Sequence, residues 1–182
     1  MALRVKFGKA PAFHEPRTLK FSQYVRPGLP PPPEKYSSLE RIVPAVGTSN
    51  PAKIFPMDGN DRYGDCVIAA VAHMVTNFHG LVGKKTIPSE EEVVKAYLDW
   101  TNGEDIGCVM FSVAKAWTKG RFFNDKIDSF VSLHRADPLD VKRAITWYGG
   151  IFLGFNVQES AISDFEANRP WTPGPAEGGH GV

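Results

Sequence analysis

The 182-residue sequence has little of three things: cysteine, net charge and long apolar runs. Two cysteines, Cys66 and Cys108, are too few for a disulfide framework, so we expect both to be thiols. The 21 Lys and Arg residues nearly balance the 20 Asp and Glu residues, which argues against a basic surface for nucleic acid or a membrane. No apolar run reaches the roughly 18–20 residues of a membrane span, and residues 1–9 do not resemble a signal peptide. We therefore expect a cytoplasmic protein.

Proline is concentrated at the start of the chain, where nine of the 15 prolines precede residue 55. Proline fixes φ and has no backbone N–H to donate. Residues 1–50 are therefore predicted to be an extended arm, without regular helix or central strand, that wraps a domain formed by residues 51–182. Residues 28–33 are predicted to form polyproline II. A docking role for this run with a proline-binding partner is an alternative that no repeat supports.

Apolar spacing and helix-end signals predict four helices and two strands after residue 56. The first predicted helix begins at Cys66, with Asp65 as its N-cap, and ends near Gly80. The second follows the capping box of Ser89 and Glu92 and ends at about residue 102. The third covers residues 109–119, and the fourth follows Asp137 as N-cap and ends at Gly149. Residues 127–133 and 151–157 are predicted strands, and residues 169–179 a loop. This order predicts an α+β fold with a helical half followed by a sheet half.

Cys66 is the candidate nucleophile, because it is predicted to open a helix. Free N–H groups and the helix dipole stabilise an anion there, although the neighbouring Asp65 carboxylate repels a thiolate. Asn60 lies six residues upstream, and its side-chain NH₂ could join the backbone N–H of Cys66 as an oxyanion hole. Cys108 also opens a predicted helix with Asn102 at the same spacing, so the spacing alone does not separate the two cysteines.

A general base is required as well, and the five histidines offer candidates. They are His14, His73, His79, His134 and His180. His180 has the most open context, because glycines flank it on both sides. His73 lies seven residues after Cys66 on nearly the same helix face, but zinc would need two further ligands. We therefore expect no metal and no cofactor, and a hydrogen-bonding role for His73.

These residues together resemble the papain-like cysteine peptidases, and more narrowly a group of phage and bacterial papain-like proteins. The resemblance rests on residues 59–66 (Gly-Asn-Asp-Arg-Tyr-Gly-Asp-Cys), Ala69-Ala70, His73, residues 103–105 and residues 178–180. It implies a cleft between the two halves, with Cys66 as nucleophile on the central helix and His180 as base from the sheet. We also expect four residues to contact the substrate in this cleft: Gly64, Asp105, Gly107 and Gly179.

One feature departs from the family pattern. Papain-like sites orient the histidine with an Asn or Asp from a following strand, whereas this chain ends two residues after His180. Either no orienting residue exists, or an upstream carboxylate or a carbonyl replaces it, or the natural protein continues and the fold is C-terminally incomplete here. The expected function is hydrolysis of amide or peptide bonds through a Cys66 thioester. A catalytically silent module that binds a peptide or protein partner, and acyl transfer to an amine, are the alternatives.

Overall fold

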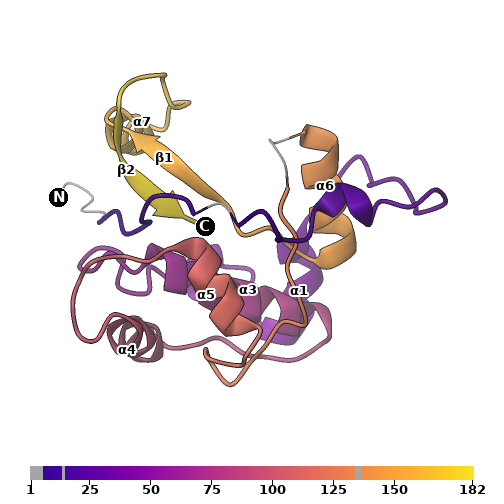
Figure 1. The fold of residues 1–182 in the computed structure, drawn as a ribbon, viewed down its shortest axis with the longest axis horizontal. Coiled ribbons are helices and arrows are strands. Elements are labelled where there is room, and N and C mark those ends of the chain that lie inside the picture. Colours follow the sequence, from indigo (N-terminus) through magenta and orange to yellow (C-terminus); the bar gives the residue numbers. More distant parts are fainter. Residues whose placement is uncertain (1–5, 14, 134–136) are drawn as a thin grey trace.

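The computed structural model describes residues 6–13, 15–133 and 137–182, and it has an α+β fold (Figure 1). The elements in chain order are the 3-10 turn η1 (Phe21–Gln23), α1 (Ser38–Val46), α2 (Pro51–Ile54), α3 (Cys66–Leu81), α4 (Glu90–Trp100), α5 (Met110–Trp117), α6 (Pro138–Tyr148), β1 (Gly154–Gln158), α7 (Ala161–Glu166) and β2 (Ala176–Gly181). Among the helices of the described ranges, none has both the length and the hydropathy to cross a membrane.

Helix α3 is the centre of the fold, and α1, α4, α5 and β2 all pack against it. Residues 66–72 are each at most 3% exposed, so the first two turns of this helix are buried on every side. Such all-round burial agrees with the run Cys-Val-Ile-Ala-Ala-Val-Ala, which has no polar face. The main core also contains Tyr97, Trp117 and Phe122 from the surrounding segments. The candidate nucleophile is therefore itself a buried member of the principal core.

The four predicted helices are present, and most of their end signals work as expected. The Ser89 side chain accepts from the Glu92 N–H while the Glu92 carboxylate accepts from the Ser89 N–H, which confirms the capping box. The Asp137 side chain accepts from the N–H of Leu139 at 2.9 Å. Asp65 does occupy the N-cap position of α3, but its side chain makes no capping hydrogen bond, so that part of the prediction is wrong.

The prediction that the first 50 residues contain no helix is also wrong. Residues 38–46 form α1, in which the Ser37 side chain accepts from the N–H of Glu40. Pro44 lies inside this helix, and its missing N–H is tolerated because α1 is short and packs on α3. Ile42 and Val46 are buried in a small second core with Ile54. Packing of this apolar face outweighs the local cost of the proline.

The rest of the arm is extended and contacts the later part of the chain. Phe21 donates its N–H to the carbonyl of Ser132 at 3.0 Å, and Ser132 donates to the carbonyl of Leu19 at 2.7 Å. The indole N–H of Trp147 donates to the carbonyl of Pro30 at 3.1 Å. Residues 19–30 therefore lie across the segment around residue 132 and across α6.

The sheet half is smaller than expected. Strands β1 and β2 form a two-stranded antiparallel sheet in which Gly154 pairs with Gly181 and Phe155 with His180. Residues 127–133 form no strand, because apart from one bridge between Ser132 and Lys20 they have no pairing segment in the described ranges. The loop predicted for residues 169–179 instead turns into a strand at residue 176. Glycine has a low strand propensity, so this stretch was predicted as loop, but hydrogen bonds to β1 stabilise it as a strand.

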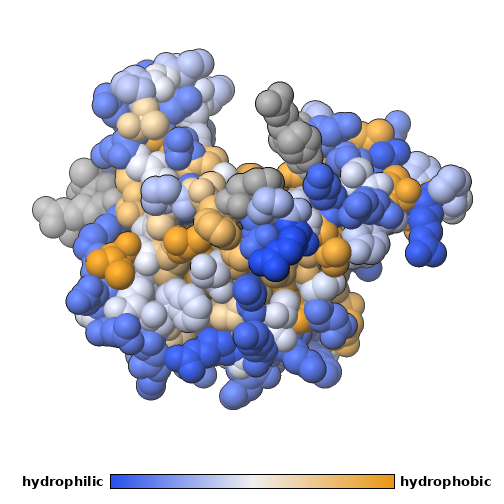
Figure 2. All heavy atoms as spheres, viewed as in Figure 1, coloured by the Kyte–Doolittle hydropathy of each residue, from blue (hydrophilic) through white to orange (hydrophobic). Residues whose placement is uncertain are grey.

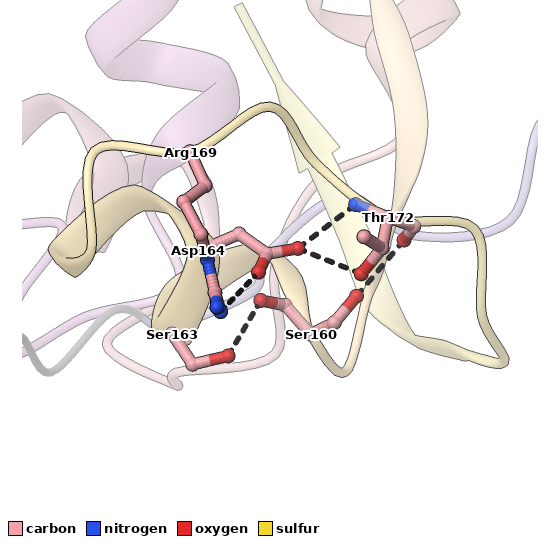
Figure 3. A network of polar contacts seen from close by, with 5 residues as sticks. All are labelled: Ser160, Ser163, Asp164, Arg169 and Thr172. Atoms are coloured by element: carbon pink, nitrogen blue, oxygen red, sulfur yellow. Dashed lines mark hydrogen bonds and ion pairs between the residues drawn. The ribbon is translucent and has the colours of Figure 1, made fainter.

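The hairpin tip between β1 and β2 is held together by one buried carboxylate (Figure 3). Asp164 is 2% exposed and accepts hydrogen bonds from Arg169 and from both the N–H and the hydroxyl of Thr172, each at 2.8 Å. Ser160 closes the same turn by donating to the carbonyl of Thr172 at 2.9 Å. The tip thus forms an ordered, largely hydrophilic projection above the helical body (Figure 2).

Gly80→Ala should destabilise the protein, although alanine normally stabilises a helix interior. A Cβ at residue 80 would lie 2.6 Å from the Cβ of Ile42, so α1 would have to move away from α3. We expect a loss of about 1–3 kcal/mol in the free energy of unfolding in place of the usual gain of up to about 1 kcal/mol. Urea unfolding measures it, and the loss should shrink when Gly80→Ala is made in an Ile42→Gly background, which lacks the clashing Cβ. A stabilised Gly80→Ala protein would contradict this packing.

Candidate functional site

The Cys66 thiol lies where β2 meets the N-terminus of α3. Its side chain is buried, with the residue 1% exposed, and Sγ accepts a hydrogen bond from the N–H of Gly181 at 3.3 Å. Burial raises the pKa of Cys66, and the Asp65 carboxylate adds to the increase. The N–H groups of Gly181 and Gly8 act in the opposite direction but do not compensate fully. In this form of the protein the thiol is therefore protonated and shielded.

Asp65 carries a buried carboxyl group. The residue is 0% exposed, and within the described ranges neither carboxyl oxygen accepts a hydrogen bond from another residue. Burial raises the pKa of Asp65 to about 7, and the nearby carboxylates of Asp58 and Asp105 contribute to the shift. The Asp65 carboxyl group beside Cys66 therefore gains or loses its proton near neutral pH.

Asn60 lies in the turn that leads to α3, but part of its amide is already engaged. Its Nδ2 donates to the carbonyl of Met57 at 2.9 Å, while Oδ1 is buried and has no partner among the described residues. Nδ2 is the donor in this contact because the carbonyl of Met57 can only accept. An amide nitrogen carries two N–H groups, so the bond to Met57 uses one of them and an oxyanion would need the other.

His180 comes from β2, directly before the glycine that contacts Cys66. Its ring lies edge-on between Phe7 and Phe155, with ring centroids 6.2 and 5.9 Å away. Nδ1 is buried and unpartnered, and burial lowers the pKa of this imidazole. Within the described ranges His180 makes no hydrogen bond to Cys66 and has no orienting carboxylate or carbonyl. Strand pairing brings the two residues close in the fold without joining their side chains.

Residues 6–10 of the arm occupy the space between the two halves (Figure 1). The four residues predicted to contact substrate all lie against this segment: Gly64, Asp105, Gly107 and Gly179. Asp105 pairs with the Lys6 ammonium, and the N–H of Lys9 donates to the carbonyl of Gly179 at 3.0 Å. The predicted substrate residues are thus gathered around the chain's own N-terminal segment, and we call the space that residues 6–10 occupy between them the groove.

Asp105 joins the two loops that form the helical wall of this groove. Its Oδ1 accepts from the N–H of Gly64 at 2.8 Å and from the hydroxyl of Tyr97 at 2.7 Å. The Tyr97 hydroxyl in turn accepts from the N–H of Gly107 at 2.9 Å. The loops before Cys66 and before Cys108 therefore hold their positions through one carboxylate and one phenol.

The other candidate histidines and the second cysteine are engaged elsewhere or buried. His73 Nε2 lies 3.0 Å from an Asp58 carboxylate oxygen, and His79 Nε2 lies 2.8 Å from Asp125. His14 and His134 lie outside the described residues. Burial raises the pKa of Cys108 to about 12. Within the described ranges no group of His, Cys, Asp and Glu side chains could hold a metal ion.

Several residues of the groove were not singled out from the sequence. Phe7 and Gly8 come from the arm, Tyr97 from a predicted helix for which no site role was expected, and Gly181 from the residues next to His180. Gly8 carried a weak signal, as a glycine between Phe7 and Lys9 in a segment otherwise marked by proline. The contacts themselves join distant parts of the chain, so no local pattern could report them.

Comparisons with known proteins add no relative to these observations. No protein-family model, no curated protein and no solved structure matches this chain.

Proposed function

We propose that this chain is a papain-like, cysteine-dependent hydrolase of peptide or amide bonds, with Cys66 as its nucleophile. The observation that carries the proposal is the hydrogen bond from the N–H of Gly181 to Cys66 Sγ at 3.3 Å. It joins the start of the central helix to the strand that bears His180. A thiol at a helix N-terminus, an amide donor upstream and a histidine on the facing strand form the set that acyl transfer through a thioester requires.

In the proposed reaction His180 takes the proton of Cys66, and the thiolate attacks the substrate carbonyl carbon. The carbonyl oxygen becomes an oxyanion, stabilised by the backbone N–H of Cys66 and the free N–H of the Asn60 amide. Collapse breaks the C–N bond, the imidazolium gives its proton to the leaving amine, and a thioester remains. Water, deprotonated by His180, then attacks the thioester, releasing the acid and restoring the thiol.

The geometry described above corresponds to a closed form of such an enzyme. The thiol pKa is raised by burial, so attack needs an imidazole to take the proton. The His180 ring is held between Phe7 and Phe155, and it has to leave this position to reach Sγ. Phe7 belongs to the segment that fills the groove. Departure of that segment would therefore free both the substrate site and the base.

A catalytically silent peptide-binding module is the second candidate, and one observation favours it. The His180 Nδ1 is buried without a partner, so nothing in the described ranges orients the imidazole toward the thiol. A histidine without an orienting group spends much of its time as the wrong tautomer or in the wrong position. A chain of this kind would bind peptide in the groove and not turn it over.

The two candidates differ in the effect of Cys66→Ala. If Cys66 is the nucleophile, we expect hydrolysis of a fluorogenic peptide library to fall by about 10³-fold or more. The matched control is Cys108→Ala, because Cys108 is a second buried cysteine near the same groove, 2% exposed. It should change hydrolysis less than about twofold, because its thiol takes no part in the proposed reaction.

A thioester trapped on Cys66 by mass spectrometry would support the hydrolase directly. If the Cys66→Ala protein kept its activity, Cys66 could not be the nucleophile. If no substrate were turned over while peptide still bound to both the parent and the Cys66→Ala protein, the silent module would be the correct reading.

A further inference from the structure

The groove that residues 6–10 fill makes its hydrogen bonds through main-chain atoms. On the helical side the N–H of Lys6 donates to the carbonyl of Asn60 at 2.9 Å, and the N–H of Cys108 donates to the carbonyl of Gly8 at 2.7 Å. The N–H of Ala10 returns a bond to the carbonyl of Cys108 at 2.9 Å. Any extended peptide offers the same N–H and C=O groups, so this pattern does not depend on the segment's belonging to the chain.

At its centre the groove admits a main chain without a side chain. A Cβ on Gly8 would lie 1.7 Å from the carbonyl oxygen of Gly64, and a Cβ on Gly107 would lie 2.2 Å from the carbonyl oxygen of Gly8. On the strand side, a Cβ on Gly179 would lie 2.5 Å from the carbonyl oxygen of Lys9. These obstacles are backbone atoms, which cannot move aside as a flexible side chain can. Glycine is therefore required opposite Cys66.

The flanking positions of the segment are recognised through side chains. The Phe7 ring packs on Gly178, where a Cβ would lie 2.7 Å from the ring, and it meets the His180 ring edge-on. The Lys6 ammonium pairs with the Asp105 carboxylate. The methylene groups of Lys9 pack on Gly154, and a Cβ on Gly154 would lie 2.7 Å from the Lys9 Cδ. The groove therefore favours an aromatic residue before the glycine, a basic residue before the aromatic one, and a long aliphatic stem after the glycine.

We propose that this groove is a binding site for extended peptides with a basic-aromatic-Gly core, and that residues 6–10 occupy it in cis until they are displaced. The proposal names the ligand class of the proposed hydrolase and rests on that function for its meaning, but binding itself needs no chemistry at Cys66. A cis segment competes at a high effective concentration. The apparent affinity for a peptide in trans is the intrinsic affinity multiplied by the fraction of molecules in which the groove is open.

Gly8→Val in the full-length chain should open the groove, because valine cannot fit against Gly64. The probe is fluorescently labelled Lys-Phe-Gly-Lys-Ala, the sequence of residues 6–10, and binding is followed by anisotropy in a Cys66→Ser background that removes turnover. We expect the Gly8→Val chain to bind the probe at least about tenfold more tightly than its parent. The probe with Val in place of Gly should bind at least about tenfold more weakly than the Gly probe.

Matched controls separate the groove from the rest of the surface. Gly174 lies on the hairpin tip, where a Cβ would meet only the Ser160 hydroxyl at 3.8 Å. The Gly174→Val chain should therefore bind the probe as weakly as the parent. Adding Gly179→Val to Gly8→Val should abolish binding, because the strand wall would then exclude the peptide as well. Phe7→Ala, which weakens the cis segment without a clash, gives a second test should Gly8→Val unfold.

The proposal is overturned if both Gly8→Val and Phe7→Ala bind the probe no better than the parent, or if the Val probe binds as well as the Gly probe. Its failure is distinguishable from failure of the proposed hydrolase. Tight, glycine-dependent binding without turnover by chains that keep Cys66 would refute the hydrolase alone. Turnover that is equal in the parent and in Gly8→Val would refute the cis occupant alone.

Discussion

Asp65→Asn should raise the free energy of unfolding by up to about 4 kcal/mol above pH 8 and change it little at pH 4. The carboxyl group is buried and has no hydrogen-bond partner among the described residues, and burial raises its pKa from 3.8 in the unfolded chain to about 7 in the native protein. Below pH 4 both states bind the proton. As the pH rises toward 7 the unfolded chain releases it first, so the parent loses stability over this window. Asparagine does not titrate, so its chain avoids this loss.

Urea unfolding at pH 4 and pH 8.5 measures the difference. Asp61→Asn is the matched control, because Asp61 lies in the same turn with its side chain 53% exposed. It should change stability by less than about 0.5 kcal/mol at either pH. The Asp65→Asn chain should also show a lower Cys66 pKa, since one source of repulsion is gone. Equal effects of Asp65→Asn at the two pH values would mean that Asp65 does not titrate near neutrality.

Asp105→Ala is expected to destabilise the protein at neutral pH by about 2–5 kcal/mol. Its carboxylate accepts from the N–H of Gly64, the hydroxyl of Tyr97 and the ammonium of Lys6. The first two donors would be left partly buried without an acceptor, and each such loss costs about 1–3 kcal/mol. The loops that form the helical wall of the groove would also lose their common anchor, so peptide binding should weaken with stability.

The pH dependence of Asp105→Ala has the opposite sign to that of Asp65→Asn. Burial alone would raise the pKa of Asp105, but the hydrogen bonds from Lys6, Tyr97 and Gly64 outweigh it and lower the pKa. The stabilisation by Asp105 is thus complete above the ordinary carboxyl pKa and is lost as the pH falls through the lowered value. The effect of the substitution should therefore shrink in acid. Asp99→Ala removes an exposed ion pair with Lys95 and should cost less than about 0.5 kcal/mol.

If Asp105→Ala cost no more than Asp99→Ala at pH 7, the groove wall would not depend on this carboxylate. Chemical unfolding across pH 3 to 8 provides the comparison. In the parent protein we expect the two aspartates to have opposite effects on the pH profile, because Asp65 destabilises the native state as the pH rises and Asp105 stabilises it.

The helices could be predicted because their signals are local. The apolar positions after Cys66, the capping box at Ser89 and the N-cap Asp137 each report contacts within one or two turns. Helix α1 was missed because Pro44 opposes a helix locally, while the packing of Ile42 on α3 that favours it is a tertiary contact. The resemblance placed His180 on a strand, but residues 176–179 of β2 were predicted as loop because glycines have low strand propensity and the partner β1 is separated from β2 by the hairpin tip.

By itself the sequence determined the α+β order and the position of Cys66 at a helix start, because both follow from residue type and short spacing. Asn60 was suggested as a companion by its spacing, and His180 by its flanking glycines and the family resemblance, and both roles stay predictions. Only the tertiary structure decided that the thiol is buried, that Gly181 rather than His180 contacts it, and that Gly8 lies against Gly64 and Gly107. Such close approaches are steric facts about segments far apart in the chain. Periodicity and capping describe how a segment folds on itself, and they carry no information about which segment will lie against it.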